Sequence, residues 1–275
     1  MKRSRTGLSL DPKYRIKVLE KAFRVLELFD DKAKELTTTE IQGQVGLNKT
    51  STFRIIKNLE EFGYLEKDPE TLKYRLGIKV YYLGSLVQPY VSLRKVARPL
   101  LQELNRRTQE TVHLAVLNRG QSLYLEKLDG QKTIRVMTSI GAKLPAHCSG
   151  VGKVLLAGLP QEEVQAIIAA RGLQRFTVNT ITGAPDLQEE LERVRRQGYA
   201  TDNEEIELGL KCAAAPVFIN GRTLAAVSVS VPKDRFDQQP ESFVGMVKDT
   251  AQEISRTLAE MELARAAQPR AAKGA

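Results

Sequence analysis

The feature that most constrains the fold is the stretch GLNKTSTFRIIKNLEEF, residues 46–62. Asn48 is a good helix N-cap, and the apolar residues from Ile55 to Phe62 recur at helical spacing on one side of the helix that follows. The other side carries basic, hydroxyl and amide side chains: Lys49, Thr50, Ser51, Arg54, Lys57 and Asn58. A helix of this kind packs its apolar side into a core, so its basic side is left to contact an anionic partner.

Two further helices are predicted before this one. Residues 14–31 have apolar side chains at helical spacing, and residues 36–47 form a shorter helix that Thr37 or Thr38 caps. Gly46 ends this second helix, because glycine adopts the left-handed conformation at a helix C-terminus without strain. Helices joined by a tight glycine turn, with a basic outer face on the last one, are typical of a helix-turn-helix that binds the major groove of double-stranded DNA.

A β-hairpin is predicted directly after the third helix. Apolar and basic residues alternate at strand period in residues 72–76, and DPE at residues 68–70 supplies the turn. A hairpin in this position forms the wing of a winged helix, with Lys73 and Arg75 on its outer face. Arginine reads guanine, and lysine and hydroxyl groups contact phosphates or bases, so these two residues join the six on the helix as predicted DNA contacts.

The chain changes character after the wing. Residues 1–77 are expected to form the winged helix-turn-helix domain, and residues 78–108 linker helices with a break near Pro89. Residues 109–265 are expected to form a second domain, and residues 266–275 a disordered tail. Strands and helices mix in the second domain and several strands are consecutive, which indicates an α+β fold with an antiparallel sheet flanked by helices.

Turn signals divide the second domain into elements. Arg119-Gly120 and Asn220-Gly221 each separate two apolar strand-like runs, as in β-hairpins. Residues 132–140 are expected to add a strand. Helices are expected within residues 150–172, with a break at Pro160, and at about 184–198 and 240–263.

Composition excludes several classes of protein. The chain has 275 residues, enough for two domains, and only two cysteines, which fits a reducing compartment rather than a disulfide framework. No apolar run approaches the ~18 residues of a membrane span, and the basic N-terminus lacks the apolar segment of a signal peptide. We therefore expect a cytoplasmic protein without a membrane partner, and the net charge of +9 is compatible with a polyanionic one.

Motifs along nearly the whole chain, about residues 16–263, resemble the IclR-type transcriptional regulators. VLEKAFRVLELF and LTTTEIQGQVGLNKTSTFRIIKNLEEFGYLEKDPETLKYRLG are similar to the winged helix of that family. GAKLPAHCSGVGKVLLAGLP, RRQGYATDNEEIELGLKCAAAPVF and AAVSVSVP are similar to its GAF-like effector-binding domain. The resemblance implies a repressor or activator without a cofactor, active as a homodimer or homotetramer on a palindromic operator, that senses a small organic or aromatic acid.

The resemblance also implies an effector site. HCSGVG is expected to lead into a helix N-terminus, where backbone amides can hold a carboxylate. Ser228 and Ser230 lie two apart on one predicted strand and so face the same side. The effector-binding residues implied in this way are His147, Ser149, Gly150, Val151, Asp202, Cys212, Ser228 and Ser230.

Two other functions remain open at the level of sequence. A metal-responsive regulator would need a zinc site, for which the common ligand types are His113, His147, Cys148 and Cys212. No short spacing of two ligands supports such a site beyond the adjacent His147 and Cys148, so no metal is expected. A small-molecule enzyme with an accessory DNA-binding domain would use a cysteine nucleophile with a nearby base. The sequence shows no such set of residues, so no catalytic residue is predicted.

Overall fold

The structure is a computed structural model that describes residues 12–30, 33–132 and 138–267. The described residues form two compact units, one up to Val91 and the other from Ser92 onward. The predicted linker, residues 78–108, is divided between these units rather than standing apart from both. We describe each unit separately.

The N-terminal unit begins with η1 (Pro12–Tyr14) and continues with α1 (Lys17–Leu26), α2 (Thr38–Val45) and α3 (Lys49–Glu61). Thr37 caps α2 in a reciprocal arrangement with Glu40. The Thr37 hydroxyl accepts from the Glu40 amide at 3.2 Å, and the Glu40 carboxylate accepts from the Thr37 amide at 2.7 Å. This capping box satisfies two amides that the first turn of the helix leaves without partners.

The turn between α2 and α3 forms as the sequence predicts. Gly46 ends α2 in the left-handed conformation, with φ of 67°. Asn48 caps α3, its side-chain oxygen accepting from the Ser51 amide at 2.8 Å. The predicted helix-turn-helix is therefore confirmed in its helices and in both caps.

The wing follows α3 as β1 (Leu65–Lys67) and β2 (Tyr74–Leu76), paired antiparallel. Asp68 shapes the turn between them, because its carboxylate accepts from the amides of Glu70 and Thr71. Tyr74 is buried and pairs through its backbone with Leu36, which ties the wing to the helices. The short helix α4 (Ile78–Ser85) completes this unit.

The structure corrects the predicted burial of several apolar residues. Phe62 was expected on the packed side of α3, but α3 ends at Glu61 and Phe62 is 61% exposed. The first helix packs on α2 and α3 through a narrow side that includes Val25. Its large apolar side chains Val18, Leu19 and Phe23 stay exposed.

The C-terminal unit is built on one six-stranded sheet in which every neighbouring pair is antiparallel. Its order across the sheet is β5-β4-β3-β8-β7-β6. The strands are β3 (Thr111–Asn118), β4 (Gln121–Leu128), β5 (Lys143–Pro145), β6 (Ala200–Asn203), β7 (Leu210–Ile219) and β8 (Arg222–Pro232). Arg119-Gly120 and Asn220-Gly221 form the two predicted hairpin turns, and all four residues have positive φ.

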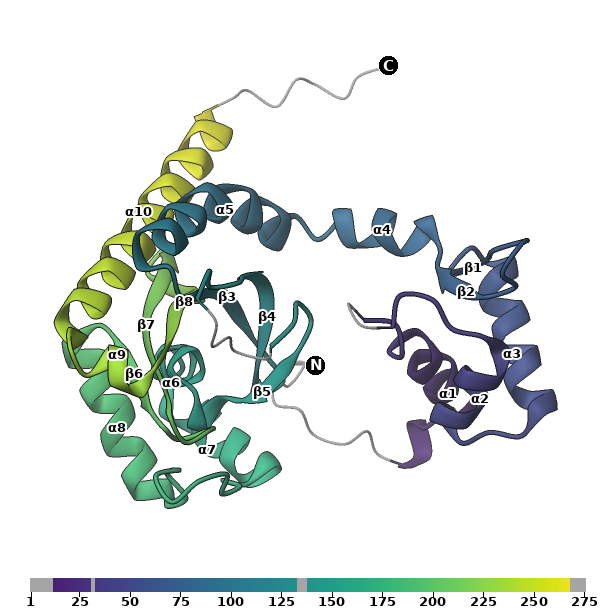
Figure 1. Cartoon of the computed structure of the whole chain (residues 1–275), viewed down its shortest axis with the longest axis horizontal. Helices are drawn as coiled ribbons and strands as arrows, with labels where there is room; N and C mark the ends of the chain where they lie inside the picture. The colour runs from purple at the N-terminus through teal and green to yellow at the C-terminus, as the bar shows by residue number, and fades with distance from the viewer. Residues whose placement is uncertain (1–11, 31–32, 133–137, 268–275) are drawn as a thin grey trace. The chain divides into compact units, whose positions relative to one another are not determined.

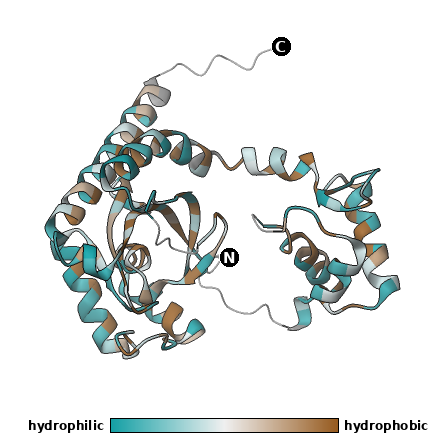
Figure 2. Cartoon of the chain, in the orientation of Figure 1, coloured by the Kyte–Doolittle hydropathy of each residue, from teal (hydrophilic) through white to brown (hydrophobic). Residues whose placement is uncertain are grey.

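Helices cover both faces of this sheet (Figure 1). They are α5 (Gln88–Thr108), η2 (Ala146–Cys148), α6 (Gly150–Ala157), α7 (Gln161–Arg171), α8 (Ala184–Gln197), α9 (Lys233–Phe236) and α10 (Pro240–Ala267). The helices α5 and α10 pack on one face, and α6 packs on the other face with α8 outside it. In Figure 2, α6 is largely hydrophobic and α8 mainly hydrophilic, as expected for an inner and an outer helix.

Side chains of the central strands alternate between these two helical layers. Val227, Val229 and Val231 of β8 join the core formed with α5 and α10, whereas Ala226 joins the core around α6. Ser228 and Ser230 have the same parity as Ala226, so they face the α6 side. The α+β class with an antiparallel sheet and flanking helices is therefore confirmed.

Some predicted elements fall elsewhere. The expected strand at 132–140 lies mostly outside the described residues, and its described ends are not in a strand; the edge strand is β5 instead. The strand β6 was not predicted from the sequence. The predicted tail, residues 266–275, lies outside the described residues except for its first two, which end α10. None of the described helices combines the length and apolar character needed to cross a bilayer.

Candidate functional site

The outer face of α3 presents most of the predicted DNA contacts. Lys49, Thr50, Arg54, Lys57 and Asn58 are exposed. Lys49 and Arg54 form no side-chain hydrogen bond or ion pair within the described residues, so their charges are available to a partner. This face matches the part of a helix-turn-helix that enters the major groove.

Other predicted DNA contacts are partly engaged within the chain. Lys57 Nζ lies 2.8 Å from Glu60 Oε2, and the Asn58 amide donates to the Arg54 carbonyl at 2.8 Å. On the wing, Arg75 Nε lies 3.3 Å from Glu66 Oε2 on the paired strand. These exposed pairs are weak and exchange readily for contacts with phosphate.

Three residues of this region differ in exposure or identity from the predicted set of exposed polar contacts. Ser51 is half-buried, since it sits in the first turn against the cap. Lys73 is also half-buried. Phe53, which was not predicted to contact DNA, is exposed on α3. The ammonium group of Lys57 lies 6.0 Å from the centroid of its ring.

The C-terminal unit contains a cavity of about 120 Å³ between the sheet and the start of α6, which we call the sheet cavity. It is lined by His113, Tyr124, Thr138, Leu144, Ser149, Gly150, Val151, Asp202, Ile206, Glu207, Leu210, Cys212, Ser228 and Ser230. Seven of the eight predicted effector-binding residues are in this lining, so the fold brings together residues that lie up to 81 positions apart, from Ser149 to Ser230.

One wall of the sheet cavity is a chain of hydrogen-bonded polar side chains on β7, β8 and β3, which ends at Thr138 outside the strands. The Cys212 thiol donates to Ser230 Oγ at 3.1 Å, and Ser230 Oγ lies 3.4 Å from His113 Nδ1. His113 Nε2 lies 2.7 Å from Thr138 Oγ1. Burial lowers the pKa of His113 to about 3, so its imidazole is neutral and can both donate and accept.

His113 and Tyr124 were not among the predicted effector-binding residues. His113 pairs with Ser228 across β3 and β8, so the period-two alternation of TVHLAV was the signal that could have placed it on this face. Tyr124 is on the same face of the next strand. Its ring centroid lies 4.8 Å from that of His113, and its hydroxyl has no hydrogen-bond partner within the described residues.

The N-terminus of α6 forms another wall of the sheet cavity. Ser149 caps this helix by accepting from the Gly152 amide at 3.2 Å. The amides of Gly150 and Val151 belong to the first turn, where an α-helix leaves its N–H groups without internal partners. Both residues line the cavity, so their amides and the positive end of the helix dipole are placed to hold an anionic group.

Asp202 is the most unusual group in the lining. It is 1% exposed, and its Oδ1 accepts from the Glu205 amide at 2.7 Å. Its Oδ2 is buried without a hydrogen-bond partner. Burial raises the pKa of Asp202 to about 7, so near neutral pH much of this carboxyl is protonated and can donate a hydrogen bond.

A buried ion cluster lies behind Asp202. Lys153 of α6 is fully buried, with its Nζ 2.5 Å from Glu205 Oε1 and 3.0 Å from Glu190 Oε1. Arg193 also pairs with Glu190. The cluster joins α6, α8 and the segment after β6, and the Glu205 amide connects it to Asp202. It therefore fixes the back of the sheet cavity.

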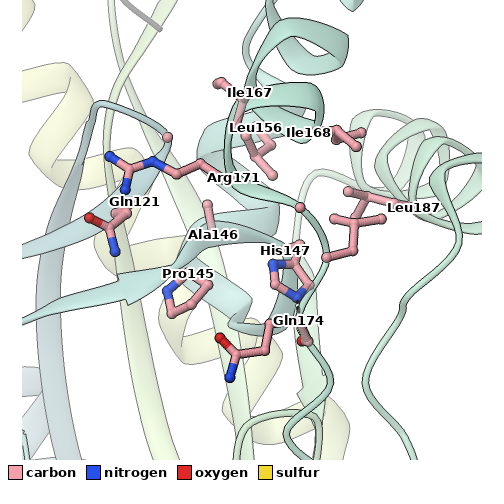
Figure 3. A pocket seen from close by; sticks show the side chains of 13 residues that line it. Gln121, Pro145, Ala146, His147, Leu156, Ile167, Ile168, Arg171, Gln174 and Leu187 are labelled. Carbon is pink, nitrogen blue, oxygen red and sulfur yellow. Dashed lines mark hydrogen bonds between the residues drawn. The ribbon is translucent and has the colours of Figure 1, made fainter. Parts of the chain in front are cut away.

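His147 is placed differently from its prediction. It lines a separate cavity of about 190 Å³ between the β3–β4 turn, η2 and helices α6, α7 and α8, which we call the helix cavity. Its Nε2 lies 3.0 Å from the Gln174 carbonyl oxygen (Figure 3). Among the described residues, none lines both cavities.

The candidate zinc ligands are also separated. His113 and Cys212 line the sheet cavity, whereas His147 lines the helix cavity. Within the described residues, no group of three or more histidine, cysteine or acidic residues is placed to hold a metal ion.

A winged helix-turn-helix with an exposed basic helix, followed by a sheet domain with a polar internal cavity, defines a DNA-binding regulator that responds to a small molecule. Comparisons with known proteins agree. Residues 18–69 match the IclR helix-turn-helix domain, and residues 87–256 match the C-terminal domain of bacterial IclR transcriptional regulators. The chain belongs to the IclR family of bacterial transcriptional regulators.

Individual relatives match over most of their length. The transcriptional regulator XynR of Escherichia coli is 36% identical over 245 residues, which covers 88% of this chain and 97% of XynR. The E. coli transcriptional repressor AllR is 32% identical over 246 residues, covering 87% and 89%. A crystal structure of an IclR homolog from Microbacterium hydrocarbonoxydans in complex with 4-hydroxybenzoate superimposes with a TM-score of 0.79 at 27% identity, covering 89% and 100%.

Proposed function

We propose that this regulator binds a palindromic operator through the outer face of α3 and binds a small carboxylic acid in its sheet cavity. It acts in the cytoplasm as a repressor or activator, and the ligand changes its affinity for DNA. The observation that carries the ligand proposal is that the free amides at the start of α6 and the unpartnered, buried Asp202 Oδ2 belong to one cavity.

The carboxylate of the ligand is placed at the start of α6. Gly150 and Val151 offer backbone amides there, and a side chain at position 150 would crowd Ala214, since an added Cβ would lie 3.3 Å from the Ala214 Cβ. Glycine thus lets the first turn of α6 lie close to β7. Ser228 and Ser230 add hydroxyls from the sheet side.

Charge in the lining requires that Asp202 be neutral when an acid binds. The described lining contains two acids, Asp202 and Glu207, and neither lysine nor arginine. An ionised Asp202 would repel a carboxylate in this buried space. A protonated Asp202 instead donates a hydrogen bond to it, and the raised pKa makes this form accessible near neutral pH.

The remaining lining favours a ligand with an apolar body. Leu144, Val151, Ile206 and Leu210 supply aliphatic surface, and the Tyr124 ring lies among the polar groups. The unpartnered Tyr124 hydroxyl offers a hydrogen bond to a second polar group of the ligand. A hydroxylated aromatic acid meets these demands, and a related structure contains 4-hydroxybenzoate.

Binding, rather than catalysis or metal sensing, accounts for the cysteines. Burial raises the pKa of Cys148 to about 12 and raises the pKa of Cys212 well above its usual value. A nucleophilic cysteine needs a lowered pKa, because the thiolate is the reactive form. Both thiols stay protonated, so Cys212 acts as a hydrogen-bond donor to Ser230.

We assign the DNA contacts to Lys49, Thr50, Ser51, Arg54, Lys57, Asn58, Lys73 and Arg75. Arg54 is the residue on α3 with a free guanidinium, which suits a bidentate contact to guanine. Lys49 at the start of the helix and the wing cations suit phosphate contacts. Contacts of this second kind make affinity depend on salt concentration.

The assembly is proposed to be a homodimer or a homotetramer. Large apolar side chains of α1 and α4 are exposed in the N-terminal unit, including Phe23, Ile78 at 77% and Tyr81 at 75%. Apolar surface of this kind marks a contact with another chain. A two-fold dimer would also match a palindromic operator. Sedimentation of the full chain and of Ile78→Asp measures the oligomeric state of each. The assembly of the variant should dissociate into smaller species.

The ligand proposal is tested by calorimetric titration of the full chain with 4-hydroxybenzoate and with its neutral analogue 4-hydroxybenzamide. The acid should bind more tightly than the amide, and its affinity should fall about tenfold between about pH 6 and about pH 8, as Asp202 ionises. In Asp202→Asn this pH dependence should disappear, because the asparagine amide donates at both pH values. Equal affinity for the acid and the amide would contradict the proposal that the start of α6 binds a carboxylate.

A further inference from the structure

The helix cavity is larger than the sheet cavity and has different walls. It lies between the β3–β4 turn at Gly120 and the ends of α6, α7 and α8. Its volume is about 190 Å³, against about 120 Å³ for the sheet cavity. The turn is packed tightly on α7, because an added Cβ at Gly120 would lie 2.7 Å from Ile167 Cγ2. This wall is therefore fixed by the fold.

His147 gives the helix cavity a buried polar group with an unused atom. The side chain is 5% exposed. Because the partner of Nε2 is the Gln174 carbonyl oxygen, Nε2 carries a proton, and Nδ1 has no hydrogen-bond partner within the described residues. In Figure 3, this second ring nitrogen points away from Gln174, toward the side of the cavity where Ala146 lies. Nδ1 is therefore an acceptor that keeps some accessible surface, and it is open to a hydrogen bond from a donor group of a ligand.

The charge in the helix cavity favours an anion. Arg171 is the only charged residue in its described lining, which contains no aspartate or glutamate. Arg171 Nε donates to the Arg119 carbonyl at 3.1 Å, which holds the guanidinium beside the cavity, and its Nη groups have no partner within the described residues. Gln121 and Gln174 also line the cavity, and their side-chain amides have no hydrogen-bond partner within the described residues. The described lining of the sheet cavity has the opposite composition, with acids and no cation.

The remaining walls are apolar. Leu156, Ile167 and Leu187 are buried side chains that line the helix cavity. Polar groups on one side and aliphatic groups on the other are the usual composition of a small-molecule site. We infer that the helix cavity is a second ligand site, which binds a small organic anion with an apolar body, such as an aromatic carboxylate, independently of the sheet cavity.

The histidine content of the chain makes this inference directly testable. The protein has two histidines, His113 in the sheet cavity and His147 in the helix cavity. In the full chain labelled with ¹³C at the histidine ring, each resonance therefore reports on one cavity. His147→Gln identifies the two signals. Benzoate is the probe, and benzamide is its neutral control.

Benzoate should shift the His147 resonance in a saturable manner, and benzamide should bind there at least about tenfold more weakly, as expected for loss of a charge-assisted contact. Arg171→Gln should weaken the His147 response by a similar factor and leave any His113 response unchanged. Ile168→Trp, at a half-buried position of the lining, should block the His147 response without affecting His113.

Three results would overturn the inference. One is a His147 resonance that does not move while the protein stays folded, whether or not His113 moves. Another is an equal response to benzoate and benzamide. The third is an unchanged benzoate affinity at His147 in Arg171→Gln. Because the His113 resonance is read in the same spectra, failure at the helix cavity remains distinguishable from failure of the proposed sheet-cavity ligand.

Discussion

His147 and Ser149 are separated by a single residue, yet they line different cavities. His147 belongs to η2, which leads directly into α6, and Ser149 is the cap of that helix. A ligand in either cavity therefore contacts the same short segment from one side.

Arg54→Ala should weaken specific operator binding by about 1–3 kcal/mol, the range for a lost bidentate base contact. The side chain is exposed and has no partner in the described residues, so folding and oligomeric state should not change. Fluorescence anisotropy on the natural operator measures the loss. Lys57→Ala is the matched control and should lose less, because a lysine contacts a phosphate as a single charge and makes no bidentate contact to a base. Unchanged operator affinity in Arg54→Ala would refute the assignment.

Asn48→Ala should destabilise the N-terminal unit by about 1 kcal/mol, since it removes the side-chain oxygen that accepts from the Ser51 amide at 2.8 Å. Urea denaturation followed by circular dichroism measures this change. Thr50→Ala, two residues away on the exposed surface of α3, is the control and should be nearly neutral. Equal stability of the two variants would show that the cap contributes nothing.

Asp202→Asn should remove a pH-dependent destabilisation. Burial raises the pKa of Asp202 from 3.8 to about 7 in the folded state, so the folded chain holds the proton more tightly than the unfolded chain. The contribution of Asp202 to the free energy of unfolding is therefore greatest below about pH 4. It declines as the pH rises to about 7, by about 4 kcal/mol in total.

The measurement is urea unfolding of wild type and Asp202→Asn across this range. The free energy of unfolding of Asp202→Asn should increase relative to that of the wild type as the pH rises, and the difference should become constant above about pH 7. Opposing effects of His113 are the same in both proteins and cancel. A difference that does not depend on pH would mean that Asp202 is ionised throughout.

Lys153→Met should destabilise the C-terminal unit by about 3–5 kcal/mol, because it leaves the buried carboxylates of Glu190 and Glu205 without their shared cation. Arg193→Met is the control. Arg193 also pairs with Glu190 but is largely exposed, so its loss should be much smaller. Thermal unfolding measures the stability of both variants. Similar losses of stability in the two would show that the buried lysine contributes no more than the exposed arginine.

Much of the N-terminal unit is determined by local sequence. The caps at Thr37 and Asn48 and the turn at Gly46 depend on atoms no more than a few residues apart, so residue type and spacing suffice to predict them. The common face of Ser228 and Ser230 follows in the same way from the alternation of a strand. Resemblance to the family supplied the other predicted residues of the sheet cavity, such as Asp202 and Cys212.

Tertiary structure alone decided which cavity each polar residue enters. His147 was predicted beside Ser149, but the wall it contacts is made by α7, α8 and the β3–β4 turn, which the sequence around it does not specify. His113 and Tyr124 joined the sheet cavity through strand pairing across the sheet. The exposure of Phe62 depended on where α3 ends. Local hydrogen bonds and side-chain periodicity can be read along the chain, whereas burial and shared cavities depend on contacts between segments that are distant in sequence.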